Sequence, residues 1–248
     1  MIKLSRGACP SELTDDVRDE LTKLYAANKN RDVWNSPKIK EPLKRALLDM
    51  SHSKCSYCEC TLNIESKDVT IDHFIPKSIN AGKVVEWENL FPTCLRCNRK
   101  KNDSEEVLIN PCKEEPRKFL ALCRENPFRL KGMDAEGVGK KTIKEIGLND
   151  PIRVMGPRME QWEDIHQRME DICEDINDEG YKDKYRNRLK VLMEKCTEDN
   201  AYSAIKASNM LEDSYYKAMK DIIVKNGKWT DGMSELEEEM KKVALQFI

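Results

Sequence analysis

Four cysteines arranged as two short pairs form the strongest chemical signal in the sequence. Two residues separate Cys55 from Cys58 and Cys94 from Cys97, and 35 residues lie between the two pairs. Four thiolates at such spacing can surround one zinc ion tetrahedrally, at about 2.3 Å each. Because protein atoms would fill every position, such a zinc ion would be structural, with no position open to a substrate. Cys60 lies beside the first pair and is an alternative ligand to Cys58.

The segment between the two pairs carries side chains suited to phosphodiester hydrolysis. Asp72 and His73 follow a short strand-like run, residues 69–71, and Asn98 comes directly after the second cysteine pair. A histidine with its ordinary pKa near 6.5 can abstract a proton from water at neutral pH. Asp72 and Asn98 offer hard oxygen atoms, which Mg²⁺ and Mn²⁺ prefer. Because adjacent strand residues point to opposite faces, the chain must bend after His73 to bring Asp72 and His73 to one site.

The order of these residues resembles the HNH nucleases of the ββα-metal fold. Between residues 54 and 102 the matching segments read Cys-x2-Cys, Ile-Asp-His-Phe-Ile-Pro-Lys, Glu-Asn-Leu and Cys-x2-Cys-Asn-x2-Lys. The resemblance implies that His73 is the general base and that Asp72 is a ligand of a catalytic Mg²⁺ or Mn²⁺ ion. It also implies that Asn89 holds the loop that carries His73. Asn98 stands where the family uses His or Asn, as a second ligand, so this chain is a His-Asn-Asn variant.

A local group of basic residues lies at the end of this motif. The whole chain has 43 Lys and Arg against 45 Asp and Glu, a formal net charge of −2. The protein therefore lacks the overall positive charge of one that coats nucleic acid. Residues 94–101 nevertheless include basic side chains and no acidic one. The expected phosphate contacts are Arg96, Arg99, Lys100 and Lys101, together with Lys77 near the His73 loop.

Helical patterns flank the cysteine-rich segment on both sides. Apolar residues recur at helical spacing after Pro10, where Ser11 is the expected N-cap, and again over residues 43–50 and in several stripes beyond Pro111. We expect a mainly α protein. A zinc-stapled ββα-metal (HNH) module, residues 51–105, is inserted between a helical arm, residues 1–50, and a helical C-terminal region, residues 106–248. The module has few apolar residues, so a bound zinc ion is expected to stabilise it.

Composition excludes some other classes of protein. No run of about 18 apolar residues is present, which argues against a membrane span. The first residues, Met-Ile-Lys-Leu-Ser-Arg, lack an apolar signal core, so a cytoplasmic location is expected. In that reducing compartment, clustered cysteines favour metal binding over disulfides.

Segments outside the motif resemble a narrower family. Met-Ile-Lys-Leu-Ser-Arg-Gly at residues 1–7, Pro10, Ile-Gly-Leu-Asn at residues 146–149 and Arg158 are similar to the HNH components of bacterial Septu-type and retron-linked antiphage systems. The resemblance implies a nuclease that works beside an ABC-type ATPase. We therefore expect metal-dependent hydrolysis of invading nucleic acid, DNA rather than RNA, with the partner docked after Pro111. Two alternatives stay open: a stand-alone restriction or repair HNH nuclease, and a non-catalytic zinc-bound module that binds nucleic acid or protein.

Overall fold

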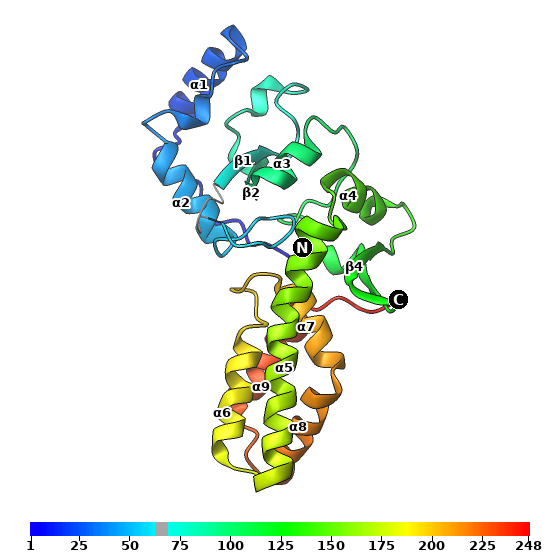
Figure 1. The fold of residues 1–248 in the computed structure, drawn as a ribbon. Helices are drawn as coiled ribbons and strands as arrows, with labels where there is room; N and C mark the ends of the chain where they lie inside the picture. Colours follow the sequence, from blue (N-terminus) through cyan, green and yellow to red (C-terminus); the bar gives the residue numbers. More distant parts are fainter. Residues whose placement is uncertain (63–68) are drawn as a thin grey trace.

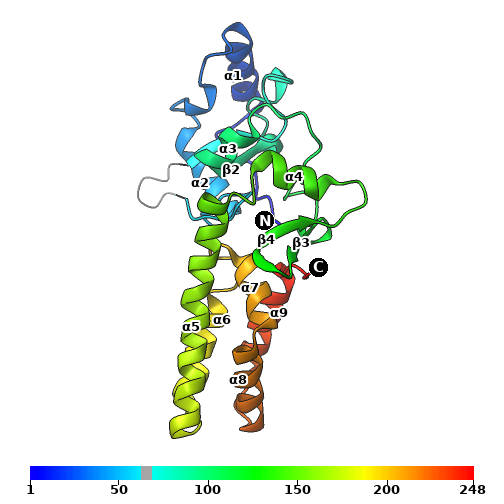
Figure 2. The same cartoon turned by 45° about the vertical axis from the view of Figure 1, so that its right-hand side comes forward.

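The computed structural model describes residues 1–62 and 69–248, and it divides into an upper α/β part and a helical bundle that projects below it (Figure 1). Figure 2 shows that the helices of the bundle run away from the small sheets, and that both chain termini lie near the junction of the two parts. The bundle comprises α5 (Gly156–Glu179), α6 (Asp183–Glu194), α7 (Ser203–Glu212), α8 (Ser214–Lys225) and α9 (Asp231–Val243). No helix in the described ranges combines the length and apolar character needed to cross a membrane.

The N-terminal arm contains two helices joined by a short 3₁₀ turn. They are α1 (Asp15–Ala27) and α2 (Lys40–Met50), with the turn η1 (Val33–Asn35) between them. The expectation that Ser11 caps the first helix is wrong, because the helix begins four residues later. Thr14 is the N-cap, and its hydroxyl accepts a hydrogen bond from the backbone N–H of Val17. Asp15 and Asp16 occupy the first turn, where negative charge stabilises a helix.

The cysteine-rich segment forms a small ββα unit. Strand β1 (Val69–His73) pairs antiparallel with β2 (Leu90–Cys94), so that Asp72 lies opposite Phe91 and His73 opposite Leu90. Helix α3 (Leu95–Lys101) follows β2 directly and packs on both strands. Two 3₁₀ turns lie in the connection between the strands, η2 (Ala81–Lys83) and η3 (Trp87–Asn89). This arrangement matches the ββα architecture that the motif predicts.

The region after residue 105 does not begin with helices, which corrects the expectation of a helical C-terminal region from residue 106. The turn η4 (Pro116–Lys118) leads into an antiparallel hairpin of β3 (Leu120–Cys123) and β4 (Asn126–Gly132). Helix α4 (Val138–Ile146) then packs on β4 and on α3. The close approach of α4 to β4 needs glycine, because a Cβ atom on Gly132 of β4 would lie 2.4 Å from the backbone nitrogen of Lys140 in α4. Residues 106–146 therefore extend the nuclease part and are not part of the bundle.

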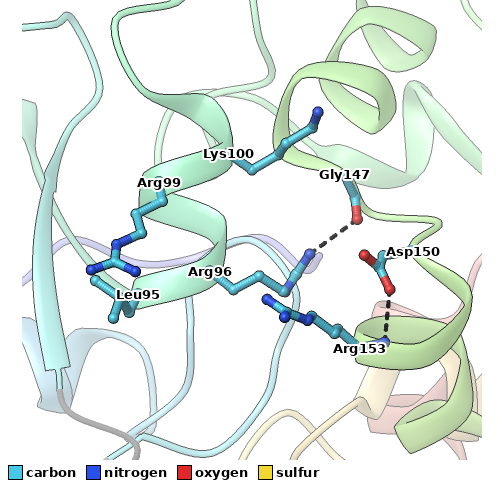
Figure 3. Close-up of a pocket in the computed structure, with 7 residues that line it drawn as sticks. All are labelled: Leu95, Arg96, Arg99, Lys100, Gly147, Asp150 and Arg153. Carbon is cyan, nitrogen blue, oxygen red and sulfur yellow. Dashed lines mark hydrogen bonds between the residues drawn. The ribbon is translucent and has the colours of Figure 1, made fainter.

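The predicted apolar stripe on α5 forms one wall of the bundle core. Its buried residues are Trp162, Ile165, Met169, Ile172 and Ile176. The stripes predicted on α6 and α9 are likewise buried, through residues such as Leu189 and Met240. The helix α5 is preceded by a π-helical turn, η5 (Pro151–Met155), which lies beside α3 in the upper part (Figure 3).

A buried charge cluster joins the cysteine-rich segment to the bundle. Glu59 is buried, with 2 % of its surface exposed. Its carboxylate accepts hydrogen bonds from the hydroxyl of Ser203 at 2.8 Å and from the backbone N–H of Ala204 at 3.3 Å. The same carboxylate pairs with the amino group of Met1. Burial alone would raise the pKa of Glu59, but the Met1 amino group and Lys54 outweigh it and lower the pKa to about 2. Glu59 is therefore a charged anchor between the cysteine segment and the first turn of α7.

Replacement of this anchor is expected to destabilise the fold. In Glu59→Gln, an uncharged amide would leave the ammonium groups of Met1 and Lys54 without their buried counter-charge. We expect the free energy of unfolding to fall by about 3 kcal/mol, the scale for breaking a buried ion pair from one side. Urea denaturation followed by circular dichroism measures it. Glu163→Gln, on an exposed position of α5, is the matched control; equal loss in both variants would contradict the anchor.

Candidate active site and zinc centre

The two cysteine pairs meet as the sequence spacing predicts. The Sγ atoms of Cys55, Cys58, Cys94 and Cys97 all lie within 4.8 Å of one another, and Cys58 and Cys94 are 3.8 Å apart. Tetrahedral zinc with sulfur ligands at about 2.3 Å requires sulfur–sulfur separations of about 3.8 Å. The four side chains therefore fit a structural zinc ion, and Cys60 stays outside this set of four.

Local backbone geometry shapes the first cysteine pair. The backbone N–H of Cys55 donates to the oxygen of Cys60 at 2.8 Å, and the N–H of Glu59 donates to the oxygen of Cys55 at 3.0 Å. Glu59 closes this turn in the left-handed region, with φ of 65°. Arg96 on α3 donates a hydrogen bond to the sulfur of Cys97 at 2.8 Å. A positive group beside a zinc thiolate partly offsets the negative charge of four such ligands.

His73 lies at the end of β1 with its ring held in one orientation. Its Nε2 is 2.8 Å from the backbone oxygen of Val84. Because a carbonyl oxygen only accepts hydrogen bonds, Nε2 must carry the hydrogen, and Nδ1 keeps a lone pair. Burial lowers the pKa of His73 to about 4, so the ring is neutral at pH 7. The ring of Trp34 packs edge-on against it, with centroids 4.9 Å apart. The geometry thus presents Nδ1 as a proton acceptor.

The side chain of Asn89 binds the backbone at two places in the segment that follows His73. Its Oδ1 accepts from the N–H of Ile75 at 2.7 Å, and its Nδ2 donates to the oxygens of Ile75 at 2.9 Å and Lys83 at 3.1 Å. Lys83 precedes Val84, whose carbonyl orients the histidine ring. The side chain is buried at 4 % exposure. Asn89 therefore connects the loop after His73 to the segment that fixes its tautomer.

The variant Asn89→Asp tests this connection. A carboxylate can still accept from Ile75 but cannot donate to the two carbonyl oxygens, so the loop should shift away from its position. A misplacement of about 1 Å can cost about 100-fold in rate, and we expect a loss of that size in single-turnover cleavage of nucleic acid. Asn80→Asp is the matched control, because Asn80 only accepts a hydrogen bond, from Gly82. Undiminished cleavage by Asn89→Asp would show that the connection is unimportant.

Asp72 is buried and held by two partners. Tyr57 donates to Oδ2 at 2.6 Å, and the ammonium of Lys101 lies 3.3 Å from each carboxylate oxygen. Lys101 also donates to the backbone oxygen of His73 at 2.7 Å. Burial raises the pKa of Asp72, whereas Lys101 and Tyr57 act to lower it. Lys101 is itself 2 % exposed. Its expected role as a phosphate contact is therefore wrong: the helix turns this lysine inward, where it orients Asp72.

One pocket of about 260 Å³ brings the three motif side chains together. It is lined by Asp72, His73, Pro76, Lys77, Leu95, Asn98, Arg99, Asn102 and Asp103. The Nδ2 atom of Asn98 donates to Oγ1 of Thr70 at 3.0 Å and to the oxygen of Ile71 at 3.3 Å, so the amide oxygen is on the opposite side of the group. A carboxylate and an amide oxygen suit a divalent ion such as Mg²⁺ or Mn²⁺ that keeps several waters.

The other expected phosphate contacts divide between two pockets. Lys77 and Arg99 line the pocket of His73, and the ammonium of Lys77 lies 4.1 Å from the centroid of the Trp34 ring. Arg96 and Lys100 line a neighbouring pocket, which also contains Arg99. Trp34 was not predicted as a site residue, and its polar surroundings in the sequence give no signal for it. Asn102 also lines the pocket of His73, although it follows α3 as its C-cap, with φ of 46°, and lies outside the helix. Its spacing of four residues from Asn98 is the signal in the sequence that could have found it.

Comparison with known proteins agrees with this geometry. A family model for the HNH endonucleases matches residues 55–104, which include both cysteine pairs, Asp72, His73, Asn89 and Asn98. The fold and site thus define an HNH endonuclease, an enzyme that acts on phosphodiester bonds.

Two relatives extend the match beyond the motif. The chain is 34% identical over 240 residues to the Septu protein PtuB of Bacillus thuringiensis, which covers 92% of this chain and 89% of that protein. It is 30% identical over 193 residues to the Septu protein PtuB of Bacillus mycoides (strain KBAB4), covering 60% of this chain and 63% of that protein. The chain belongs to the PtuB family of Septu proteins.

Proposed function

We propose that this enzyme hydrolyses DNA in a metal-dependent reaction, as the nuclease of a bacterial antiphage defence system. The observation that carries the proposal is the single pocket lined by Asp72, His73 and Asn98. Asp72 and Asn98 would hold Mg²⁺ or Mn²⁺, which when bound neutralises charge that develops on the phosphate. Nδ1 of His73 accepts the proton of the attacking water. Lys77 and Arg99 neutralise further phosphate charge at the edge of the pocket.

Kinship with the PtuB proteins supports the defence role and the partner. In this proposal the enzyme works with an ABC-type ATPase, and the bundle α5–α9 provides the surface on which that partner docks. The bundle carries exposed large apolar side chains, Met159, Val191 and Val224, each close to half exposed. The formal net charge of −2 also disfavours tight binding to nucleic acid by the chain alone, which is consistent with substrate delivery by a partner.

Cleavage assays test the reaction. The purified protein, with and without the co-expressed ATPase, is incubated with duplex DNA, single-stranded DNA and RNA of one sequence at graded Mg²⁺ and Mn²⁺ concentrations. We expect cleavage of DNA that requires a divalent ion and ends when EDTA is added. Cleavage of RNA alone would overturn the DNA assignment, and cleavage in EDTA would overturn the metal requirement. A stand-alone nuclease would show full activity without the ATPase.

Co-expression tests the partner. Size-exclusion chromatography of the chain with its ATPase should give one co-eluting peak at micromolar concentration, with ATP or ADP present. Replacement of Val191 and Val224 by Asp should separate the two without unfolding the chain, because both side chains are exposed. Clean separation of the unaltered proteins under every nucleotide condition would contradict the docking proposal.

A further inference from the structure

A second, strongly basic pocket lies beside the catalytic one. It has a volume of about 530 Å³ and forms where α3 faces the turn between α4 and η5. Figure 3 shows its lining residues, which are Leu95, Arg96, Arg99, Lys100, Gly147, Asp150 and Arg153. In this view Arg96 and Arg153 extend toward each other from opposite walls. Arg153 comes from outside the HNH motif, so the pocket joins the nuclease module to the region that follows it.

Positive charge exceeds negative charge in the lining of this pocket. Within residues 1–62 and 69–248, no carboxylate forms an ion pair with any of its four basic side chains, Arg96, Arg99, Lys100 and Arg153. The one acidic residue of the pocket, Asp150, accepts hydrogen bonds from the backbone N–H groups of Ile152 and Arg153. These backbone bonds, together with the nearby Arg96 and Arg153, lower the pKa of Asp150, which contributes one negative charge to the pocket. Arg96 also donates a hydrogen bond to the sulfur of Cys97, so part of its charge is offset by the cysteine cluster. With Arg99, Lys100 and Arg153 the lining still carries a net positive charge, which favours binding of an anion.

The backbone around the pocket holds the basic groups in place. Arg96 donates a hydrogen bond to the backbone oxygen of Gly147 at 3.1 Å. Gly147 ends α4 in the left-handed region, with φ of 70°, and a Cβ atom there would lie 3.2 Å from the side chain of Lys100. The turn thus packs directly against the aliphatic part of Lys100. This is a surface of fixed shape, in which two elements position the charges before any ligand binds.

The chemistry of the pocket favours a phosphate group over a base. Apart from Leu95 and Gly147, its lining consists of charged side chains, and none of these lining residues is aromatic. Recognition of a base would call for a stacking surface, whereas guanidinium and ammonium groups bind phosphate oxygens. Arg99, Lys100 and Arg153 are exposed, so a long polyanion can reach them.

The position of the pocket indicates which phosphate it binds. Leu95 and Arg99 line both this pocket and the one that contains His73. Because α3 contributes side chains to both pockets, the two lie next to each other, and a strand with its scissile phosphate beside His73 would have neighbouring phosphates near the basic pocket. We propose that the pocket binds a backbone phosphate of the strand being cut, close to the scissile bond. This inference rests on the proposed nuclease function and adds Arg153 to its substrate-binding residues.

Salt-dependent binding tests the proposal. Fluorescence anisotropy measures the affinity of the full chain for a labelled DNA oligonucleotide at several salt concentrations, with His73→Ala in the background to prevent cleavage. Loss of one phosphate contact in Arg153→Ala should reduce the slope of log affinity against log salt by about 0.7–0.9, and weaken binding about five- to eightfold at 0.1 M salt. Lys225→Ala, which removes an exposed positive charge at the far end of the bundle, should change neither (Figure 1). Arg153→Lys should retain most of the binding.

Three outcomes separate the possibilities. Equal affinity and slope in Arg153→Ala and Lys225→Ala would overturn the pocket, while the proposed nuclease function would still stand on cleavage by the unaltered protein. If the unaltered protein cleaves no nucleic acid but Arg153→Ala still lowers the slope, the nuclease function fails and the pocket stands. Competition by ATP at micromolar concentration, lost in Arg153→Ala, would assign the pocket to a free nucleotide and overturn the strand contact.

Discussion

His73→Ala should lower the cleavage rate by about 10²–10⁴-fold while divalent-metal and substrate binding are retained, the usual scale for loss of a general base. The structure gives the reason: the ring is neutral at pH 7 because burial lowers its pKa to about 4, and the Val84 carbonyl leaves Nδ1 as the acceptor. The alanine variant loses this oriented proton acceptor, whereas Asp72 and Asn98 would remain to hold the metal ion. Single-turnover cleavage and metal titration measure the two properties separately.

Matched variants make this test specific. His166→Ala removes a histidine that pairs with Asp213 in the bundle, and it should cut at the unaltered rate. Asp72→Ala and Asn98→Ala should fail differently, by weakening the metal site, with partial rescue by Mn²⁺ because it binds such sites more readily than Mg²⁺. If His73→Ala cuts at the unaltered rate, the mechanism is wrong.

Cys94→Ser is expected to abolish zinc binding and to unfold the ββα unit. Apparent binding free energies of structural zinc are about 10–16 kcal/mol in small zinc domains, which is comparable to the whole stability of a protein domain. The four sulfurs connect the segment before β1 to the junction of β2 and α3, so their loss releases the elements that carry His73 and Asn98. Elemental analysis should find about one zinc per chain in the unaltered protein and none in the variant.

Cys9→Ser is the control for this variant, because Cys9 is exposed and lies outside the cluster. It should keep its zinc and its melting temperature. Loss of the near-ultraviolet circular dichroism signal in Cys94→Ser, but not in Cys9→Ser, would support a stabilising zinc ion. A fully folded protein without bound metal would refute the assignment.

The sequence predicted those parts of the site in which residues close together in the chain also determine where their side chains lie. Two residues between cysteines bring two sulfurs to one ion wherever the rest of the chain goes, and the four indeed converge. Asp72 and His73, as adjacent strand residues, needed a bend in the chain to share one site. The bend lies in the loop after His73, which Asn89 binds. Short spacings, together with the resemblance to the HNH nucleases, were therefore enough to predict that the four cysteines converge and that Asp72, His73 and Asn98 line one pocket.

Contacts between distant segments could not be predicted in the same way. Trp34 packs on His73 from 39 residues earlier in the chain, in a segment whose composition suggests only a loop. Helical spacing placed Lys101 on the face of Asn98, but it could not show that Asp72 and the His73 carbonyl enclose its ammonium. What covers a helix face depends on tertiary packing, which a single sequence pattern does not contain.

The hairpin of β3 and β4 was missed for a related reason. The four residues of β3 are all buried, so they show no alternation of apolar and polar residues, and such a short apolar run is ambiguous between strand and helix. Pro127 in β4 also argues against a strand, because proline has no backbone N–H to donate to a neighbouring strand. The pairing of the two strands, which is a property of both together, determines the structure of this segment.

The length of α5 has a mechanical consequence. The helix contains 24 residues, about 36 Å, and it begins at the turn that carries Arg153, directly behind the basic pocket. A tilt of about 5° at its first turn would displace its far end by about 3 Å. In the same way, a displacement imposed at the far end would tilt the first turn of α5 and so act on η5, which carries Arg153. A force that tilts the tip of the bundle would therefore move the wall of the pocket, while Glu59 holds α7 to the cysteine cluster as a second point of attachment.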